Sequence, residues 1–136
     1  MTIEPISMGA WLAALGFEMK ELTGSRVVGH LDVTPDHHTP WGVVHGGVFA
    51  TIVESTCSLG ASAAVADRGQ FAVGVCNTTD FLRPVVDGRI DVVAEPVLQG
   101  RIQQVWSVEF TRHGDKKLVA QGRLRLQNVP MPDSSA

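Results

Sequence analysis

The stretch from Gly47 to Ala66 constrains the fold of this chain more than any other. Its 20 residues contain a single charged side chain, Glu54, and the apolar and small residues lie on every side of a helix with 3.6 residues per turn. A helix that is apolar all round is normally buried. The rest of the chain must therefore supply elements that surround this helix.

The residues after this segment predict those elements. Four strand-like stretches, 70–81, 88–98, 102–112 and 117–127, are separated by turn signals such as Asp87-Gly88 and Gln99-Gly100. Long strands that follow one buried helix predict an α+β fold, with an antiparallel sheet wrapped around the helix.

The residues before the segment predict two smaller features. Residues 5–15 have apolar side chains at helical spacing, with Ser7 as a cap and Gly16 as a stop. Residues 17–22 and 26–33 alternate on either side of Thr23-Gly24, which is typical of a hairpin.

Composition narrows the class of protein. The 136 residues, 44% of them hydrophobic, suit one domain over 1–128, with a disordered tail over 129–136. The net charge of -3 includes no basic cluster, so nucleic acid is not an expected partner. We expect no signal peptide or membrane span, and hence a cytoplasmic protein. Two cysteines, Cys57 and Cys76, are expected to be buried free thiols.

Glu54 is the residue that needs an explanation. A carboxylate buried in the middle of a helix carries a large desolvation cost unless a partner stabilises it. We therefore expect Glu54 to be paired, protonated or functional. The alternative to catalysis is a hydrogen bond to neighbouring backbone or an ion pair between two chains.

Gly46 and Gly47 lie where the predicted helix begins. The first N–H groups of a helix lack partners within it, and the helix dipole adds partial positive charge there. Such a terminus can stabilise an oxyanion, although a glycine pair also forms ordinary turns. Glu54 follows Gly47 by about 10 to 11 Å along a regular helix, on the same face as Ser58. A carbonyl bound at the helix start thus cannot meet Glu54 of the same chain unless the helix entry is kinked.

His45 comes directly before the glycines. Together with His37 and His38 it makes a poor zinc site, because the spacing is irregular and no carboxylate is suitably placed, so we expect no metal. We expect His45 to orient the loop or to donate a hydrogen bond to a substrate carbonyl. The sequence has no phosphate-binding GK[ST] and no GxSxG elbow.

The segments WGVVHGGVFATIVES, AVGVCNTTDFLRPV and EPVLQGRIQQVWSVEF together resemble the hotdog-fold acyl-CoA thioesterases. They resemble specifically the branch that contains the PaaI-type and Arthrobacter-type 4-hydroxybenzoyl-CoA thioesterases, and the resemblance covers about residues 17–126. It implies a curved antiparallel sheet around one long central helix. It also implies a homodimer paired through its sheets, often as a dimer of dimers, with residues of both chains in each active site.

The resemblance also implies roles for individual residues. Glu54 matches the catalytic carboxylate, acting as nucleophile or as base for water, and Gly46 matches the backbone donor to the thioester oxygen. His45 and Gly47 flank that donor, and Ser58 matches a hydroxyl residue that helps to place water. Arg83, Gly100 and Arg101 match residues that lie along the coenzyme A part of the substrate, where an arginine can pair with phosphates. No other cofactor is implied.

One residue departs from the family pattern. Thr39 stands six residues before His45, where the family often has an amide side chain that assists the thioester carbonyl. This departure leaves two alternatives to hydrolysis of an aryl- or fatty-acyl-CoA. One is a hotdog protein that binds an acyl ligand without turnover, and the other is an esterase for oxygen esters. The His and Asp arrangement of hotdog hydratases is not found.

Overall fold

The computed structural model describes residues 7–132. Its elements along the chain are α1 (Gly9–Leu15), β1 (Phe17–Thr23), β2 (Arg26–Asp32), the short 3-10 helix η1 (Pro35–His37), α2 (Gly46–Val65), the 3-10 helix η2 (Ala66–Arg68), β3 (Gln70–Phe81), β4 (Arg89–Gln99), β5 (Gln103–Arg112) and β6 (Leu118–Pro130). The six strands form one antiparallel sheet in the order β1-β2-β4-β5-β6-β3. The fold is therefore α+β, as predicted.

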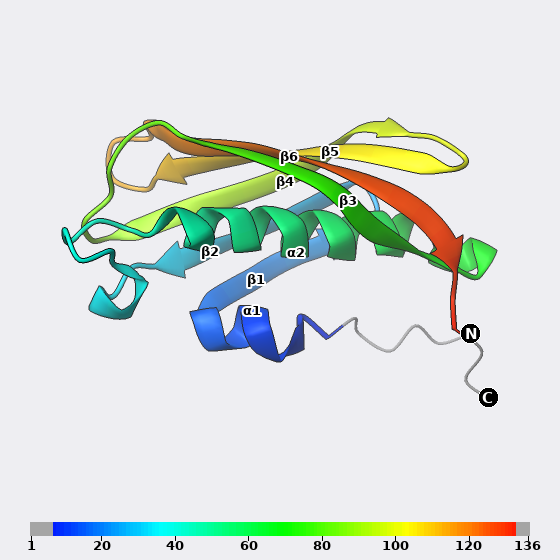
Figure 1. Ribbon diagram of the computed structural model, residues 1–136, viewed down its shortest axis with the longest axis horizontal. Coiled ribbons are helices and arrows are strands. Elements are labelled where there is room, and N and C mark those ends of the chain that lie inside the picture. Colours follow the sequence, from blue (N-terminus) through cyan, green and yellow to red (C-terminus); the bar gives the residue numbers. More distant parts are fainter. Residues whose placement is uncertain (1–6, 133–136) are drawn as a thin grey trace.

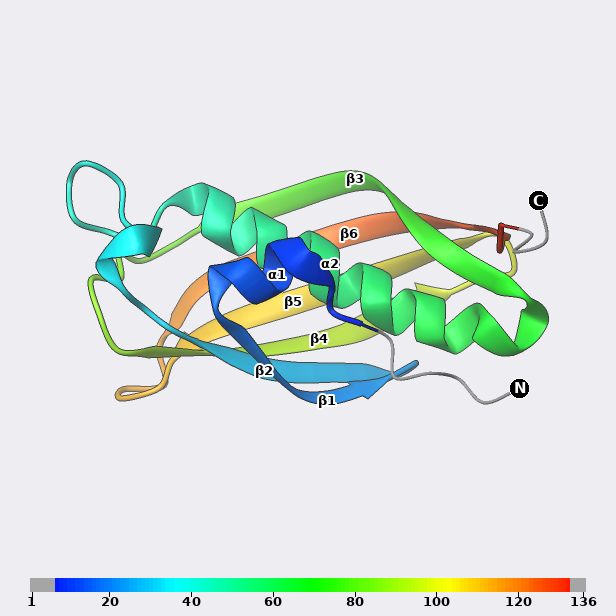
Figure 2. The same ribbon diagram turned by 90° about the horizontal axis from the view of Figure 1, so that it is seen from below.

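The sheet curves around α2 and leaves one side of that helix without strands (Figure 1). The short helix α1 lies over part of this open side, as the view from below shows (Figure 2). α1 ends at Gly16, whose φ of 89° is the left-handed conformation that glycine favours at a helix end. Residues 5 and 6 of the predicted helix lie outside the described residues.

α2 packs tightly against the sheet through small residues. A Cβ built on Gly60 would lie 2.6 Å from the ring of Trp106, and one built on Gly24 in the β1–β2 turn would lie 2.7 Å from the Cα atom of Ala64. Phe49 meets Phe110 of β5 edge to face, with ring centroids 5.1 Å apart. The small side chains thus allow a close approach of helix and sheet, and this packing fixes the position of α2.

The prediction that α2 is buried on every side was wrong. Its sheet-facing side is buried, but Glu54 is exposed, and the positions around it are only partly covered. These partly covered residues are Thr51, Ser55, Ser58, Leu59 and Ser62. By length and hydropathy alone the segment Gly46–Arg68 could cross a membrane, but half of it is buried in the fold, as in a core helix.

The strand boundaries follow the predicted turns with one difference at the end of the chain. β6 continues to Pro130, because Val129 pairs with Phe71 and Pro130 with Gln70 of β3. The predicted boundary at residue 128 therefore falls inside β6. Residues 133–136 of the predicted tail lie outside the described residues.

β3 is an edge strand of unusual length and composition. It is 12 residues long and pairs only with β6, so its other edge is free among the described residues. Val73 and Val75 on this strand are 40% and 51% exposed. Cys76 is exposed as well, which corrects the prediction of two buried thiols. Long apolar edges of this kind are templates for pairing with another chain.

Candidate active site

The start of α2 is organised by a histidine cap. The Nδ1 atom of His45 accepts a hydrogen bond from the Gly47 N–H at 2.8 Å, and the His45 carbonyl accepts one from Val48 at 3.0 Å. A Cβ on Gly47 would lie 2.9 Å from that Nδ1 atom, so glycine lets the ring lie close to the backbone. Gly47 thus serves the cap, and its N–H is already used.

The cap leaves two donors available. The Gly46 N–H has no acceptor within residues 7–132, although it sits at the positive end of a 20-residue helix. Because the neutral His45 ring accepts at Nδ1, its proton is on Nε2, which also has no partner in the described part of the chain. The helix start therefore presents a backbone N–H and an imidazole N–H to a ligand.

An open cleft of about 330 Å³ lies beside Gly46. Its lining includes Phe81, the last residue of β3, and Arg83, which lies two residues further along the chain. A Cβ on Gly46 would lie 2.7 Å from the Phe81 ring, so the glycine allows that ring to cover the helix start. The Arg83 Nη1 atom donates to the Leu118 carbonyl at 2.6 Å, which holds the guanidinium at the rim. The structure thus places Gly46 and Arg83 in the lining of the same cleft.

Thr39 lies in the turn that leads to this cleft. Its hydroxyl accepts a hydrogen bond from the Trp41 N–H at 3.2 Å, and its backbone bonds to Val43 and Gly42 close the turn. The hydroxyl oxygen thus shapes its own loop, whereas Gly46 and His45 supply the free N–H groups at the helix start.

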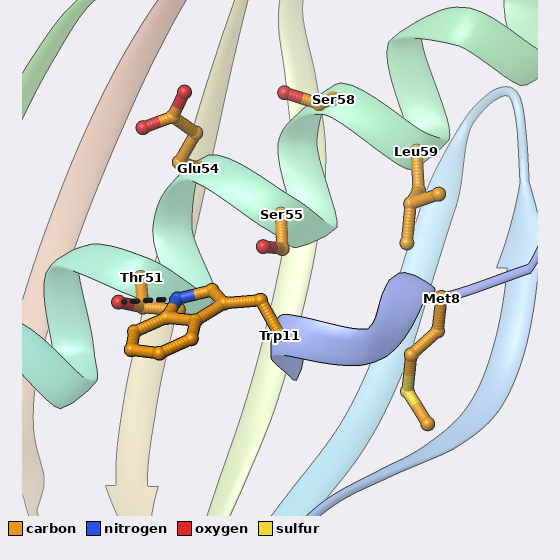
Figure 3. A pocket seen from close by; sticks show the side chains of 7 residues that line it. All are labelled: Met8, Trp11, Thr51, Glu54, Ser55, Ser58 and Leu59. Atoms are coloured by element: carbon orange, nitrogen blue, oxygen red, sulfur yellow. Dashed lines mark hydrogen bonds between the residues drawn. The ribbon is translucent and has the colours of Figure 1, made fainter. Parts of the chain in front are cut away.

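A second cleft, of about 470 Å³, lies further along α2 and contains Glu54. Figure 3 shows Glu54 and Ser58 on one side of the exposed helix face, with Met8, Trp11 and Leu59 on the other. No hydrogen bond or ion pair to the Glu54 carboxylate is present among the described residues. A Cβ on Gly74 would lie 3.5 Å from its Oε1 atom, so the carboxylate lies beside the free edge of β3.

The expectation that Glu54 is buried was wrong for the single chain. The carboxylate needs no partner there, because it is exposed to solvent next to the edge strand β3. Gly46 and Glu54 line different clefts, as their separation along the helix requires. One chain therefore holds a helix start with free donors and a carboxylate that do not meet.

Gly100 and Arg101 lie in the β4–β5 turn, at the opposite end of the molecule from the loop that carries Arg83 (Figure 1). α2, which separates these ends, is about 30 Å long. A single chain thus does not bring the two predicted arginines together.

Buried polar side chains hold the β4–β5 turn. Asn128 donates to the carbonyls of both Gly100 and Arg101 at 3.2 Å and accepts from Gln104 at 2.8 Å. Gln104 also donates to the Ala61 carbonyl of α2 at 3.0 Å and accepts from Trp106 at 2.9 Å. Every polar atom of the Gln104 side chain is satisfied, so the network fixes the turn relative to the helix.

The remaining histidine and cysteine candidates have structural positions. His37 is buried, accepts from the Thr34 N–H at Nδ1, and contacts the Leu15 carbonyl through Nε2. His38 contacts the Val86 carbonyl. Within residues 7–132 no three histidine, cysteine or acidic side chains are grouped to hold a metal ion. Burial raises the pKa of the Cys57 thiol to about 12, so this thiol is not a nucleophile at neutral pH.

Two residues near the candidate site were missed in the sequence. Trp11 donates through Nε1 to the Thr51 hydroxyl of α2 at 3.4 Å, a contact across 40 residues that no local pattern signals. Asn77 donates to the Ala50 carbonyl at 3.0 Å and so joins β3 to α2. The segment AVGVCNTTDFLRPV contains Asn77 but gives no sign of its partner on α2.

Known proteins resemble this chain over most of its length. The model of the "Thioesterase superfamily" (4HBT) matches residues 42–119. Rv1847 of Mycobacterium tuberculosis, which carries an esterase name, is 41% identical over 85% of this chain and 83% of its own. Its solved structure has a TM-score of 0.87 and covers 91% of this chain and 99% of that one.

Two further matches have thioesterase names. The 1,4-dihydroxy-2-naphthoyl-CoA thioesterase 2 of Arabidopsis thaliana is 39% identical over 90% of this chain and 82% of its own. The structure of thioesterase HI1161 from Haemophilus influenzae has a TM-score of 0.84 and 27% identity, and covers 94% of this chain and 88% of that one. The chain therefore belongs to the thioesterase superfamily and has its hotdog fold, with the long central helix α2 inside a curved antiparallel sheet.

Proposed function

We propose that the protein hydrolyses an acyl-CoA thioester at a site shared by two copies of the chain. The proposal rests on one observation about α2. The start of the helix has free N–H donors but no carboxylate nearby, whereas Glu54 in the middle has no donors nearby. Thioester hydrolysis needs both, because the carbonyl oxygen gains negative charge while a nucleophile adds to its carbon.

The free edge of β3 supports a particular pairing. Asn77 ties β3 to α2, and Glu54 lies beside Gly74 of the same strand, so the catalytic face of the helix borders this edge. Antiparallel pairing of β3 with β3 of a second copy about a two-fold axis would bring the two α2 helices side by side in opposite directions. Gly46 of one chain would then approach the partner's Glu54.

In this arrangement the residues have distinct roles. The Gly46 N–H and the His45 Nε2–H stabilise the developing oxyanion, and Gly47 permits the cap that orients the imidazole. Glu54 either attacks the carbonyl carbon or takes a proton from an attacking water that Ser58 helps to place. In either mechanism the carbon–sulfur bond breaks and water supplies the new oxygen. The products are a free acid and the coenzyme A thiol.

The coenzyme A part extends across both chains in the same arrangement. Arg83 lies near Gly46, whereas the Arg101 turn of the same chain is at the far end of α2. Because the partner's α2 would run in the opposite direction, the turn that carries the partner's Arg101 would lie toward Arg83 of the first chain. Arg83 and the partner's Arg101 would then flank the nucleotide with positive charge.

The names of relatives bear on the choice of substrate. The Arabidopsis relative is named for an aromatic acyl-CoA, and EntH of Cronobacter turicensis, 30% identical, is named a proofreading thioesterase. Rv1847 is named an esterase, and the same oxyanion site suits an oxygen ester. Release of acid from a simple aryl ester, without preference for the CoA thioester, would favour the oxygen-ester alternative.

The test of the proposed function is release of free thiol from a panel of aryl- and fatty-acyl-CoAs. We expect Glu54→Gln and Glu54→Ala to lower kcat about 10²- to 10⁴-fold, the usual contribution of an acid–base group. Glu109→Gln, which changes an exposed carboxylate on β5, is the control and should leave kcat unchanged. Turnover that survives both Glu54 substitutions would remove Glu54 from the mechanism. Thermal stabilisation by CoA esters without any hydrolysis would favour the ligand-binding alternative.

A further inference from the structure

Trp11 is a large apolar side chain in an unexpected place. It is 70% exposed in the single chain, although it belongs to α1, a helix whose neighbouring Leu12 is 1% exposed in the core. It lines the same cleft as Glu54 and Ser58 (Figure 3). An exposed indole beside a catalytic carboxylate requires a functional explanation more than an isolated surface tryptophan does.

The indole is held in a defined orientation. Its Nε1 atom donates to the Thr51 hydroxyl at 3.4 Å, and Figure 3 shows the ring lying against α2 at this point. A ring held at its polar atom presents a fixed surface, so it loses little conformational freedom when a ligand packs on it.

The ring contacts the turn of α2 that also carries Glu54. Thr51 precedes Glu54 by three residues, which places their side chains on neighbouring positions of the helix surface, about 4.5 Å apart along the axis. A thioester carbon next to Glu54 would therefore carry its acyl group toward Trp11.

The lining of the cleft indicates the kind of acyl group. The hydroxyls of Thr51 and Ser55 lie along the helix between Glu54 and Trp11, and Met8 and Leu59 supply the remaining apolar contacts. A long alkyl chain would desolvate these hydroxyls without bonding to them. A flat ring can pack on the indole and still direct a polar edge to the hydroxyls.

We propose that Trp11 is the specificity-determining residue of the thioesterase site, forming the wall on which a planar aromatic acyl group packs. This inference rests on the proposed function, since it assigns the acyl half of the same substrate. Met8 and Leu59 complete the wall, and Glu54 acts at its edge.

The experiment compares three esters of coenzyme A on purified full-length protein: benzoyl-CoA, the saturated cyclohexanecarbonyl-CoA, and hexanoyl-CoA. Trp11→Leu should lower kcat/KM for benzoyl-CoA about tenfold and change the other two by less than about twofold, since aromatic packing is lost selectively. Trp11→Phe should restore most of the benzoyl-CoA activity. Trp41→Leu is the matched control, because Trp41 is 84% exposed and lies outside this cleft.

Tryptophan fluorescence gives a readout that does not depend on turnover. In the Glu54→Gln background, benzoyl-CoA should change the emission of the protein, and the change should disappear with Trp11→Leu but persist with Trp41→Leu. An equal loss of kcat/KM for all three esters would overturn the proposal. So would a change in oligomer mass with unaltered selectivity, which would identify Trp11 as a contact between chains. Absence of hydrolysis of every ester by the wild-type protein, by contrast, would refute the proposed function itself.

Discussion

The two clefts along α2 differ in what they offer a substrate. The start of the helix has a backbone N–H and an imidazole N–H, and the cleft beside it has a guanidinium but no carboxylate. The cleft in the middle has a carboxylate, hydroxyls and an indole, but no positive charge. Each thus lacks what the other provides, although both lie on the same helix.

This difference explains why we propose a site shared by two chains. A rigid helix cannot bend its start toward its middle, so residues two turns apart remain two turns apart. In the proposed dimer, an antiparallel second helix would place the start of one helix beside the middle of the other. The two clefts would then be two halves of one site.

The largest effects are expected for two inactive variants, which can then be mixed to test whether Gly46 and Glu54 act together from different chains. Gly46→Pro removes the N–H donor while keeping the helix start, since proline is favoured at the first helical position and His45 already has an extended ψ of 135°. We expect kcat to fall about 10²- to 10³-fold. Gly46→Ala adds the same Cβ against Phe81 but keeps the N–H, so it is the matched control.

Gly46→Pro and Glu54→Gln protomers, unfolded together and refolded, should regain about a quarter of the wild-type activity. Half of the dimers are then mixed, and each mixed dimer has one intact site of two. Recovery no greater than the sum of the two separate variants would show that each site lies within one chain.

A smaller effect is expected at the rim of the first cleft. Arg83→Ala should raise KM for a CoA ester about tenfold with little change in kcat, because it removes charge-assisted hydrogen bonds to phosphate. The N-acetylcysteamine thioester of the same acid lacks the nucleotide and should be unaffected. Arg123→Ala, on the outer face of β6, serves as control. Equal effects on both thioesters would place Arg83 at the carbonyl instead.

The smallest effect is expected in the second cleft. Ser58→Ala should lower kcat about three- to tenfold, the value of one neutral hydrogen bond to the attacking water. Ser107→Ala, which removes a hydroxyl on β5 outside this cleft, is the control and should leave kcat for hexanoyl-CoA unchanged. Steady-state kinetics with one ester measures kcat for both variants. Equal values of kcat would show that Ser58 does not help to place the attacking water.

Much of the fold was predictable because its signals are local. Turn residues such as Asp87-Gly88 mark the ends of strands, and the apolar run after Gly47 marks the core helix. The candidate catalytic residues were located through spacing and family resemblance. The exposure of Glu54 was not predictable, because it depends on which side of α2 the distant strands cover. Trp11 and Thr51 meet for the same non-local reason.

The Gln104–Asn128 network should slow the local opening of the β4–β5 turn. Turns between strands are ordinarily among the first parts of a protein to open, whereas core elements open only with the whole molecule. The β4–β5 turn is tied through these side chains to α2, so its carbonyls cannot be released unless buried hydrogen bonds to the helix break. This surface turn should therefore open as slowly as the interior, which keeps the backbone of Arg101 in one position.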